Sequence, residues 1–480
     1  MKSHKTQTKS NKGLYLAVGI IVLAFAYLIT KDVRLNPVLT RTVAGMALAS
    51  LFFISFAKPD LTFYILVAYL PFNKILTGKL TAETAGITIT NILIFFCLIA
   101  WAQKAAQRKE RLFTKAALNL PIIIFIGFGV ASLFRGTSFF GTDYAMAYII
   151  PLKRWLTPVF LYFLALNVVR DKQMLKNTVV IMMFVITIAA LMCIYEYLDV
   201  RTASSLQKSR VGGIAEQANM MGGFFVYYMF LFAGFILINF RKWKYWLLSV
   251  PFVWSFIGIL TTFSRGAYLG FGFGVLSLAF IRNKFLFLLV TGMTIFLVLN
   301  PQYLPAGMAY RMSTTIKNEA IYDTGIEDRV EDSAKERLTI WKGAAEIIKD
   351  YPWLGVGYGV FPHVIGFYAP AARDMDAHNT YIIIAAEMGI PALLSFLWIL
   401  IVLFIHTRRL YRISKDKFIK AMALGFLAGL AGLLVVNMFG SRMDSDEVST
   451  YFWILAGLVF RALLLEKNEI RKAKASVRVR

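Results

Sequence analysis

Apolar runs of about 15–22 residues recur along almost the whole sequence and are separated by short polar segments. A helix rises about 1.5 Å per residue, so each run is long enough to cross the roughly 30 Å of hydrocarbon in a bilayer. Hydrophobic residues make up 58% of the chain, against about 45–50% in soluble domains. The sequence therefore predicts an all-α, polytopic integral membrane protein.

Hydropathy marks about fourteen candidate spans, and we expect about 12–14 transmembrane helices. The spans lie near 14–30, 39–57, 61–75, 86–102, 117–134, 146–169, 177–198, 220–239, 245–262, 266–281, 284–300, 389–406, 420–439 and 449–465. The third is short and contains Pro71, as a re-entrant segment would. The stretch at 146–169 contains Pro151, Lys153, Arg154 and Pro158, so we expect it to begin at the interface.

The formal net charge of +25 is concentrated in short segments between the apolar runs. This distribution indicates membrane topology and contact with anionic lipid, and no nucleic-acid partner is expected. Placing the N-terminus in the cytoplasm puts every strongly basic short segment on that side. These segments include Lys104–Lys115, Arg170–Lys176, Arg408–Lys420 and Lys467–Arg480. The charges therefore predict cytoplasmic N- and C-termini, with an uncleaved first span after the basic N-terminal tail.

This orientation puts one long hydrophilic segment, Pro301 to His378, on the outer side. The sequence then divides into a bundle of about eleven spans at 1–300, a loop at 301–378, helices at 379–465 and a basic tail at 466–480. Within the loop, 336–349 has helical spacing. Leu338, Trp341, Ala345 and Ile348 fall on one face. Pro352 and the glycines at 355, 357 and 359 are expected to end that helix.

Several polar and small residues in or near the spans have structural explanations. Cys97 and Cys193 lie inside apolar runs and predict packing, with no disulfide framework or metal cluster. The small-xxx-small spacing of Gly270 and Gly274, and of Gly425 and Gly429, predicts helix packing.

Three further signals are weaker. Gly355-Val356-Gly357-Tyr358-Gly359 resembles a phosphate loop but lacks the preceding strand and the following Gly-Lys, so we interpret it as a turn. Glu196 and Glu387 are interpreted as interfacial carboxylates, with a proton path as the alternative.

Three polar groups stand out at the outer ends of different spans. Arg265 lies between two apolar runs in a tight hairpin, where an arginine is costly and usually faces a wet or protein-lined cavity. Arg210 lies in a polar, glycine-containing outer loop, and His378 closes the long loop just before an apolar helix. The alternatives are a snorkelling Arg265, a solvated Arg210 and a helix-capping His378.

A single cavity on the outer side could gather these three groups. Two guanidiniums can hold a diphosphate through bidentate hydrogen bonds, and an imidazole beside them can activate a hydroxyl. The combination suits glycosyl transfer from a lipid diphosphate. The arginines would then stabilise the leaving group, as metal ions do in other enzymes.

The second half of the chain resembles the signature region of the bacterial O-antigen ligase family. The matching segments are Arg337-Leu338-Thr339-Ile340-Trp341, Asp350-Tyr351-Pro352-Trp353-Leu354-Gly355-Val356-Gly357, His378-Asn379-Thr380-Tyr381 and Glu387-Met388-Gly389-Ile390. Ser264-Arg265-Gly266-Ala267 and the loop from Arg210 to Asn219 look like two further landmarks of the family. Together they cover roughly residues 200–400.

The resemblance implies a GT-C-like, inverting and metal-independent glycosyltransferase of the bacterial inner membrane, with no cofactor. Its donor would be a glycan on undecaprenyl diphosphate, presented at the periplasmic face. The acceptor would be lipid A-core, a glycan chain or a protein. By matching motifs, Arg210 and Arg265 would hold the diphosphate and His378 would help to activate the acceptor hydroxyl. Arg337, Trp341, Asn379 and His363 are secondary candidates.

Other functions stay open on the sequence alone. An O-antigen or exopolysaccharide polymerase of the same superfamily would differ only in its acceptor. A solute transporter of the bicarbonate type should show repeat symmetry and broken helices near the midplane, and neither is visible. An assembly scaffold would leave Arg265 and the loop motifs unexplained. Members of the family typically have about twelve spans, so a count of fourteen bears on the subfamily.

Overall fold

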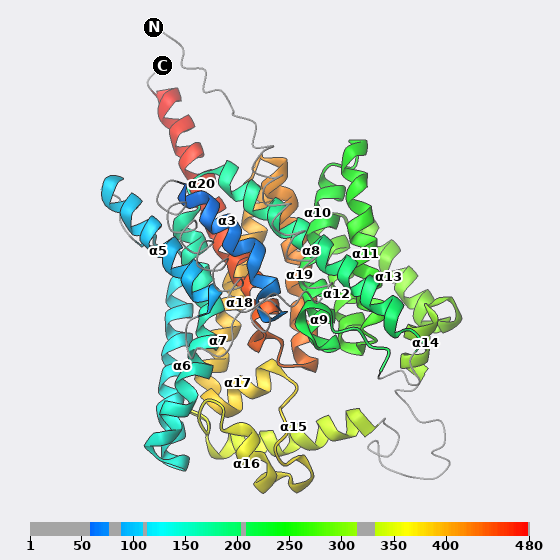
Figure 1. The fold of residues 1–480 in the computed structure, drawn as a ribbon. Coiled ribbons are helices and arrows are strands. Elements are labelled where there is room, and N and C mark those ends of the chain that lie inside the picture. The colour runs from blue at the N-terminus through cyan, green and yellow to red at the C-terminus, as the bar shows by residue number, and fades with distance from the viewer. Residues whose placement is uncertain (1–57, 76–87, 109–112, 203–207, 314–331, 479–480) are drawn as a thin grey trace, which may run out of the picture.

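The chain folds into a bundle of helices, seen in Figure 1 with a smaller group of helices at one end. This computed structural model describes residues 58–75, 88–108, 113–202, 208–313 and 332–478. The expected spans at 14–30 and 39–57 and the N-terminal tail lie outside these ranges. The described ranges contain helices and no strand, which confirms the all-α fold class.

The helices of the first half come in this order: α3 (Pro59–Tyr69), η1 (Leu70–Phe72), α5 (Ile89–Arg108), α6 (Asn119–Phe140), α7 (Thr142–Val168), α8 (Lys172–Val200), η2 (Gly213–Ala215), α9 (Ala218–Tyr228) and α10 (Phe230–Ile238). The second half contains η3 (Trp243–Leu248), α11 (Ser249–Thr261), α12 (Arg265–Arg282), α13 (Lys284–Leu299), η4 (Pro301–Tyr303), α14 (Ala306–Ser313), α15 (Asp332–Asp350), α16 (Phe361–Tyr368), η6 (Pro370–Ala372), α17 (Thr380–Met388), α18 (Ile390–Ile413), α19 (Lys417–Val436), η7 (Asn437–Phe439), η8 (Arg442–Asp444) and α20 (Asp446–Arg478).

The predicted spans coincide with helices wherever the structure describes them. Nine helices within the described ranges are long and apolar enough to cross a membrane, and α13 is a shorter apolar helix. The chain is therefore a multi-pass membrane protein. The third expected span consists of α3 and η1, with Pro71 in the final short turn. In α7, Pro151 and Pro158 lie inside one continuous helix, which begins earlier than predicted.

Glycines allow α19 to pack closely in the centre of the bundle. A Cβ added to Gly425 would meet the carbonyl oxygen of Phe230, and one added to Gly429 would meet that of Tyr227. On α12, Gly274 faces the ring of Phe230 in the same way. The predicted packing role of these small residues is confirmed, since only a missing side chain allows backbones to come this close. Cys97 and Cys193 are both buried, as expected.

The helices α15 and α16 form the smaller group at the end of the bundle (Figure 1). Helix α15 spans the predicted range and ends at Asp350, just before Pro352. Its most buried side chains are those of Ile340, Ala344 and Ile347. Of the four residues predicted to share one face of this helix, Leu338, Trp341 and Ile348 are half-buried and Ala345 is exposed, so the most buried stripe lies about one position away. Both stripes satisfy helical periodicity, so the pattern alone did not separate them.

The glycine-rich segment after α15 is a turn, as predicted, and it packs against α17. Gly355, Gly357 and Gly359 all have positive φ angles, which L side chains rarely adopt. The backbone amides of Val356 and Gly357 donate to the carbonyls of Ala386 and Glu387. The Glu387 carboxylate in turn accepts from the amide of Phe361, at 3.3 Å. Two of the segments that resemble the family signature, Asp350–Gly357 and Glu387–Ile390, therefore meet at this turn.

Candidate functional site

The carbonyls at the end of α11 hold two arginines from different parts of the chain. Nε of Arg210 donates to the Thr262 carbonyl at 2.9 Å, and Nε of Arg311 donates to the Phe263 carbonyl at 3.2 Å. Helix C-termini leave such carbonyls without partners in the helix, and their partial negative charge favours cations. Phe263 has a φ of 48°, a left-handed conformation that is costly for a bulky residue. The strained turn directly precedes Arg265, the first residue of α12.

One carboxylate and one side-chain amide fix the loop that carries Arg210. The backbone amides of Gly212 and Gly213 donate to the two oxygens of Glu196, at 3.0 and 2.9 Å. Nη2 of Arg210 donates to Oδ1 of Asn219 at 2.7 Å. Glu196 therefore serves to hold the loop, which is a more specific role than the interfacial carboxylate that we predicted.

Arg210 lies in a group of positive charges. The pKa of its guanidinium is lowered to about 10, mainly by burial and also by the charges of Arg311, Arg265 and Arg337. Arg442 is buried, and the charges of Arg337 and Arg210 lower the pKa of its guanidinium too. The structure thus groups five arginines from α12, α14, α15, η8 and the loop after α8, which we call the arginine cluster. At neutral pH all five carry charge, so the cluster suits an anionic ligand.

The sequence prediction found part of this cluster. Arg210 and Arg265 were primary candidates and Arg337 a secondary one, whereas Arg311 and Arg442 were missed. The signal for Arg442 was present, because it is the single basic residue of the short 440–448 segment. The criterion that selected Arg265, an arginine on the side that topology does not favour, applies to it equally.

His378 faces a carboxylate that the sequence prediction did not select. Nδ1 of His378 lies 3.3 Å from Oδ2 of Asp376, and the same oxygen accepts from the backbone amide of His378 at 2.9 Å. Oγ of Ser441 donates to this oxygen at 3.0 Å. The φ of His378 is 48°, so its backbone is held in the left-handed region.

Two of the secondary candidates support the backbone around His378. Asn379 is the N-cap of α17, and its Oδ1 accepts from the amides of Tyr381 and Ile382. Nε1 of Trp341 donates to the carbonyl of Ala377 at 2.9 Å. The helix-capping role considered for His378 therefore belongs to its neighbour Asn379, which leaves the imidazole available for other chemistry.

Electrostatics join the His378 pair to the arginine cluster. The charge of Asp376 acts on Arg442, whose neighbours Ser441 and Gly440 contact Asp376 and Thr380 respectively. His363 has different neighbours from those of His378. Nε2 of His363 bonds the hydroxyl of Tyr148 at 2.9 Å, and its ring lies edge-on to Phe140. That histidine belongs to the side of the loop that covers α6 and α7.

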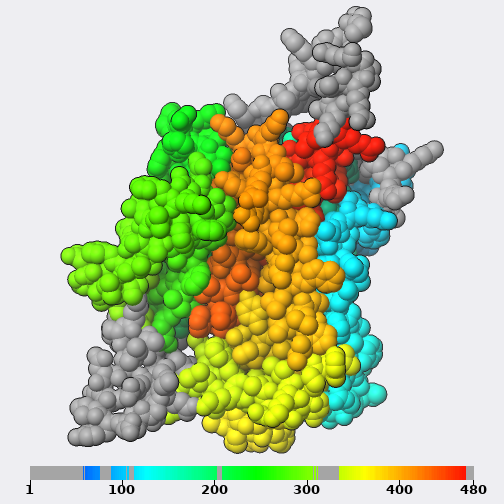
Figure 2. Space-filling model, turned by 180° about the vertical axis from the view of Figure 1, so that it is seen from behind, coloured from blue at the N-terminus to red at the C-terminus, as the bar shows by residue number. Residues whose placement is uncertain are grey.

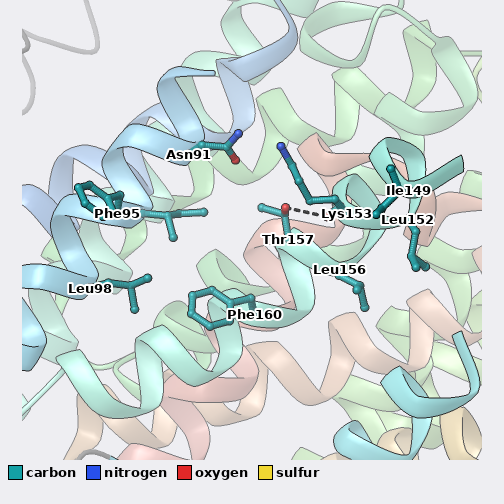
Figure 3. Close-up of a pocket in the computed structure, with 10 residues that line it drawn as sticks. Asn91, Phe95, Leu98, Ile149, Leu152, Lys153, Leu156, Thr157 and Phe160 are labelled. Carbon is teal, nitrogen blue, oxygen red and sulfur yellow. Dashed lines mark hydrogen bonds between the residues drawn. The ribbon is translucent and has the colours of Figure 1, made fainter. Parts of the chain in front are cut away.

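A groove with a different lining lies elsewhere, between α5 and α7 (Figure 3). Its volume is about 450 Å³, and its lining is apolar except for Asn91, Lys153 and Thr157. In Figure 3 the amine of Lys153 points towards Asn91. The residues that line this groove include one cation and no acid–base pair, so they lack the groups that a glycosyl-transfer reaction needs.

A second, smaller cavity lies beside the His378 pair. Its lining includes Thr380, Asp444, Trp155 and Trp453. The surrounding protein raises the pKa of Asp444 to about 7 by burial, and the charge of Asp376 adds to the effect. Among the described residues, no group of three or more His, Cys, Asp or Glu side chains has an arrangement that could hold a metal ion.

Comparison with known proteins identifies the segment that contains most of these residues. A family model described as O-antigen ligase matches residues 250–397. The chain carries an O-antigen ligase domain. No curated protein matches the chain.

The O-antigen ligase domain includes Arg265, Arg311, Arg337, Asp376 and His378. Arg210 precedes the matched residues, and Arg442 and Ser441 follow them. The fold brings these flanking residues to the domain because α9 and α19 both pack against α12. Figure 2 shows the segment around residue 440, in orange to red, between the green helices and the yellow loop region. The match supports a function of the O-antigen ligase or polymerase type, in polysaccharide biosynthesis.

Proposed function

We propose that this protein is a membrane glycosyltransferase that moves a glycan from undecaprenyl diphosphate to an acceptor hydroxyl at the periplasmic face of the inner membrane. One observation carries the proposal. The arginine cluster and the Asp376–His378 pair lie together, at the end of the bundle that the loop helices cover. A cation-rich site beside an acid–base pair suits a diphosphate leaving group and a hydroxyl nucleophile.

The transfer step follows from these groups. The acceptor oxygen attacks the anomeric carbon from the side opposite the diphosphate, and the bond from that carbon to the diphosphate oxygen breaks. The proton of the acceptor hydroxyl passes to His378, and undecaprenyl diphosphate leaves with the bonding electron pair. Configuration at the anomeric carbon inverts. Arg210 and Arg265 stabilise the negative charge that develops on the leaving group, so the step needs no metal ion.

Asp376 positions His378 for this role. A carboxylate at Nδ1 favours the tautomer that carries its proton there, which leaves Nε2 to accept the proton of the acceptor. The same carboxylate stabilises the imidazolium after the transfer. Ser441 and the backbone amide of His378 hold the carboxylate in place. A polymerase would use the same chemistry with a growing glycan as acceptor, in place of lipid A-core or a protein.

The decisive experiment is glycan transfer by purified protein in EDTA. The donor is an undecaprenyl-diphosphate glycan, and lipid A-core, free glycan and protein are offered as acceptors. We expect transfer by the wild type and at least a 100-fold loss in Arg265→Ala and His378→Ala. His363→Ala and Arg135→Ala are the matched controls, since these residues contact Tyr148 and Ser138 away from the cluster. Full activity in both site variants would remove the assignment of the site.

A further inference from the structure

Arg442 is a buried arginine whose hydrogen bonds are largely unmade. Only 2% of its surface is exposed. Its Nε has no hydrogen-bond partner in the described structure. Nη2 donates to the Phe439 carbonyl at 3.3 Å, and Nη1 lies 3.8 Å from the sulfur of Met220. A guanidinium has five N–H donors, so most of its capacity is unused.

Two glycines make room for this side chain. A Cβ on Gly440 would lie 2.7 Å from Cζ of Arg442, and one on Gly223 would lie 3.1 Å from its Cδ. The neighbouring Asn437 is also fully buried, and its Nδ2 likewise lacks a partner. The turn between α19 and α20 therefore buries unpaired donors on two side chains, an arrangement that is rare unless something else accepts from them.

Burial opposes the ionisation of Arg442. Its pKa is lowered to about 10, mainly by burial; the charges of Arg337 and Arg210 act in the same direction, and those of Tyr227 and Asp376 act against it. Asp376 is itself shared with His378 and Ser441. Burying a third cation beside two others destabilises a fold unless an anion compensates for it.

We infer that Arg442 is a third cation of the diphosphate site, kept there at a cost to the stability of the unliganded protein. The inference rests on the proposed function, because the diphosphate of the donor is the anion that compensates for the charge. Arg442 acts as a positioning residue. It raises the positive potential behind Arg210 and Arg265, the two arginines that stabilise the leaving group in the proposed function. The site therefore depends on the α19–α20 turn, outside the O-antigen ligase domain at 250–397.

The test distinguishes this role from a merely structural one through two measurements, the melting temperature and the affinity for pyrophosphate. A merely structural residue would lower the melting temperature when replaced, whereas replacing Arg442 should lower only the affinity. Arg442→Met keeps most of the side-chain volume and removes the charge. We expect the melting temperature of the unliganded variant to be equal to or above that of the wild type. We expect its affinity for inorganic pyrophosphate in EDTA to fall at least tenfold. Arg442→Lys restores the charge and should bring the affinity back to within about threefold of wild type.

Arg373→Met is the control, because it removes an exposed positive charge from the same loop region. Its pyrophosphate affinity should change less than twofold. Unchanged affinity in Arg442→Met, a lower melting temperature or failure to fold would each overturn the inference.

The same preparations distinguish this inference from the proposed function. If the wild type binds pyrophosphate, Arg442→Met binds it weakly and no donor is turned over, Arg442 keeps its role and the transferase proposal fails. If Arg442→Met binds pyrophosphate and transfers glycan as the wild type does, the transferase proposal stands and the role of Arg442 fails. If the wild type binds neither pyrophosphate nor undecaprenyl diphosphate in nanodiscs, both fail.

Discussion

Asp376 and His378, two residues apart, share a close contact in which Oδ2 of the carboxylate lies 3.3 Å from Nδ1 of the imidazole. The contact is possible because His378 has a φ of 48°, which turns the chain back on itself before α17 begins. Ser441, from the turn between α19 and α20, donates to the same oxygen. A histidine with a carboxylate at one ring nitrogen is prepared to accept a proton at the other.

Replacing Asp376 by Asn should lower glycan transfer strongly while the protein still folds. An amide has no negative charge to stabilise the imidazolium and can present an N–H to Nδ1, which favours the wrong tautomer. We expect the turnover number to fall about 100-fold or more, with a smaller change in KM, because the loss concerns the transition state. Asp374→Asn is the control, because Asp374 is an exposed residue of the same loop with a similar φ, 61°. Equal turnover in the two variants would contradict the role of Asp376.

Replacing Asn219 by Asp should weaken anion binding without unfolding the protein. Oδ1 of Asn219 accepts from Nη2 of Arg210 at 2.7 Å, so a carboxylate there would pair with the arginine. One charge of the arginine cluster would be compensated from within, and affinity for pyrophosphate should fall about tenfold, or about 1.4 kcal/mol. Gln217→Glu adds the same charge at an exposed position of the same loop. Comparable losses in both variants would show that the added negative charge acts through the overall electrostatic field and not through a pair with Arg210.

Much of this fold could be predicted from the sequence because a membrane constrains helices strongly. Each span from residue 61 onward coincides with a helix, since apolar length alone determines it. The sequence did not reveal which face of α15 is buried. The helix lies among other loop segments, and two adjacent rows of side chains both have helical spacing.

For the site, the sequence revealed isolated residues but not their contacts. Arg210, Arg265 and His378 could be selected from their positions at span ends. Asp376 could not, because its partner Ser441 is 65 residues away and a left-handed His378 is not visible in a sequence. Arg442 could have been selected by the criterion used for Arg265. Its burial beside Arg210 and Arg337 could not have been, because it depends on how α9 and α19 pack.

Helix packing in the centre of the bundle should tolerate no side chain at Gly425. A methyl group there would meet the carbonyl oxygen of Phe230 and lie 2.7 Å from Cα of Leu231. Backbone atoms cannot move aside as a flexible side chain can, so Gly425→Ala should lower stability by about 1–3 kcal/mol. Gly272→Ala is the control, because nothing lies within 4 Å of its added Cβ. Thermal unfolding in detergent should leave that variant unchanged or slightly more stable. Destabilisation of the same size in both would indicate a helix effect unrelated to packing.

Glu387 should make the protein less stable as the pH rises from about 5 to 8. The pKa of its carboxyl is raised to about 8, mainly by burial and also by the charges of Asp444 and Asp376, while the amides of Gly359 and Phe361 act in the opposite direction. Because the folded-state pKa exceeds the unfolded value, the folded protein holds a proton that the unfolded chain releases. The resulting stability is fully present below about pH 4.5 and is lost as the pH rises through about 8.

Glu387→Gln isolates this effect, because an amide oxygen can still accept from Phe361 but cannot ionise. The wild type should lose up to about 1.4 kcal/mol for each pH unit in that window from this group alone. The variant should show a shallower decline, with a remaining contribution from Asp444, whose pKa is also raised, to about 7. Melting temperatures at pH 5, 6, 7 and 8 in one detergent provide the measurement. Parallel curves for the two proteins would mean that Glu387 is ionised in the folded state, and that the turn at Gly355–Gly359 is held by a charged carboxylate.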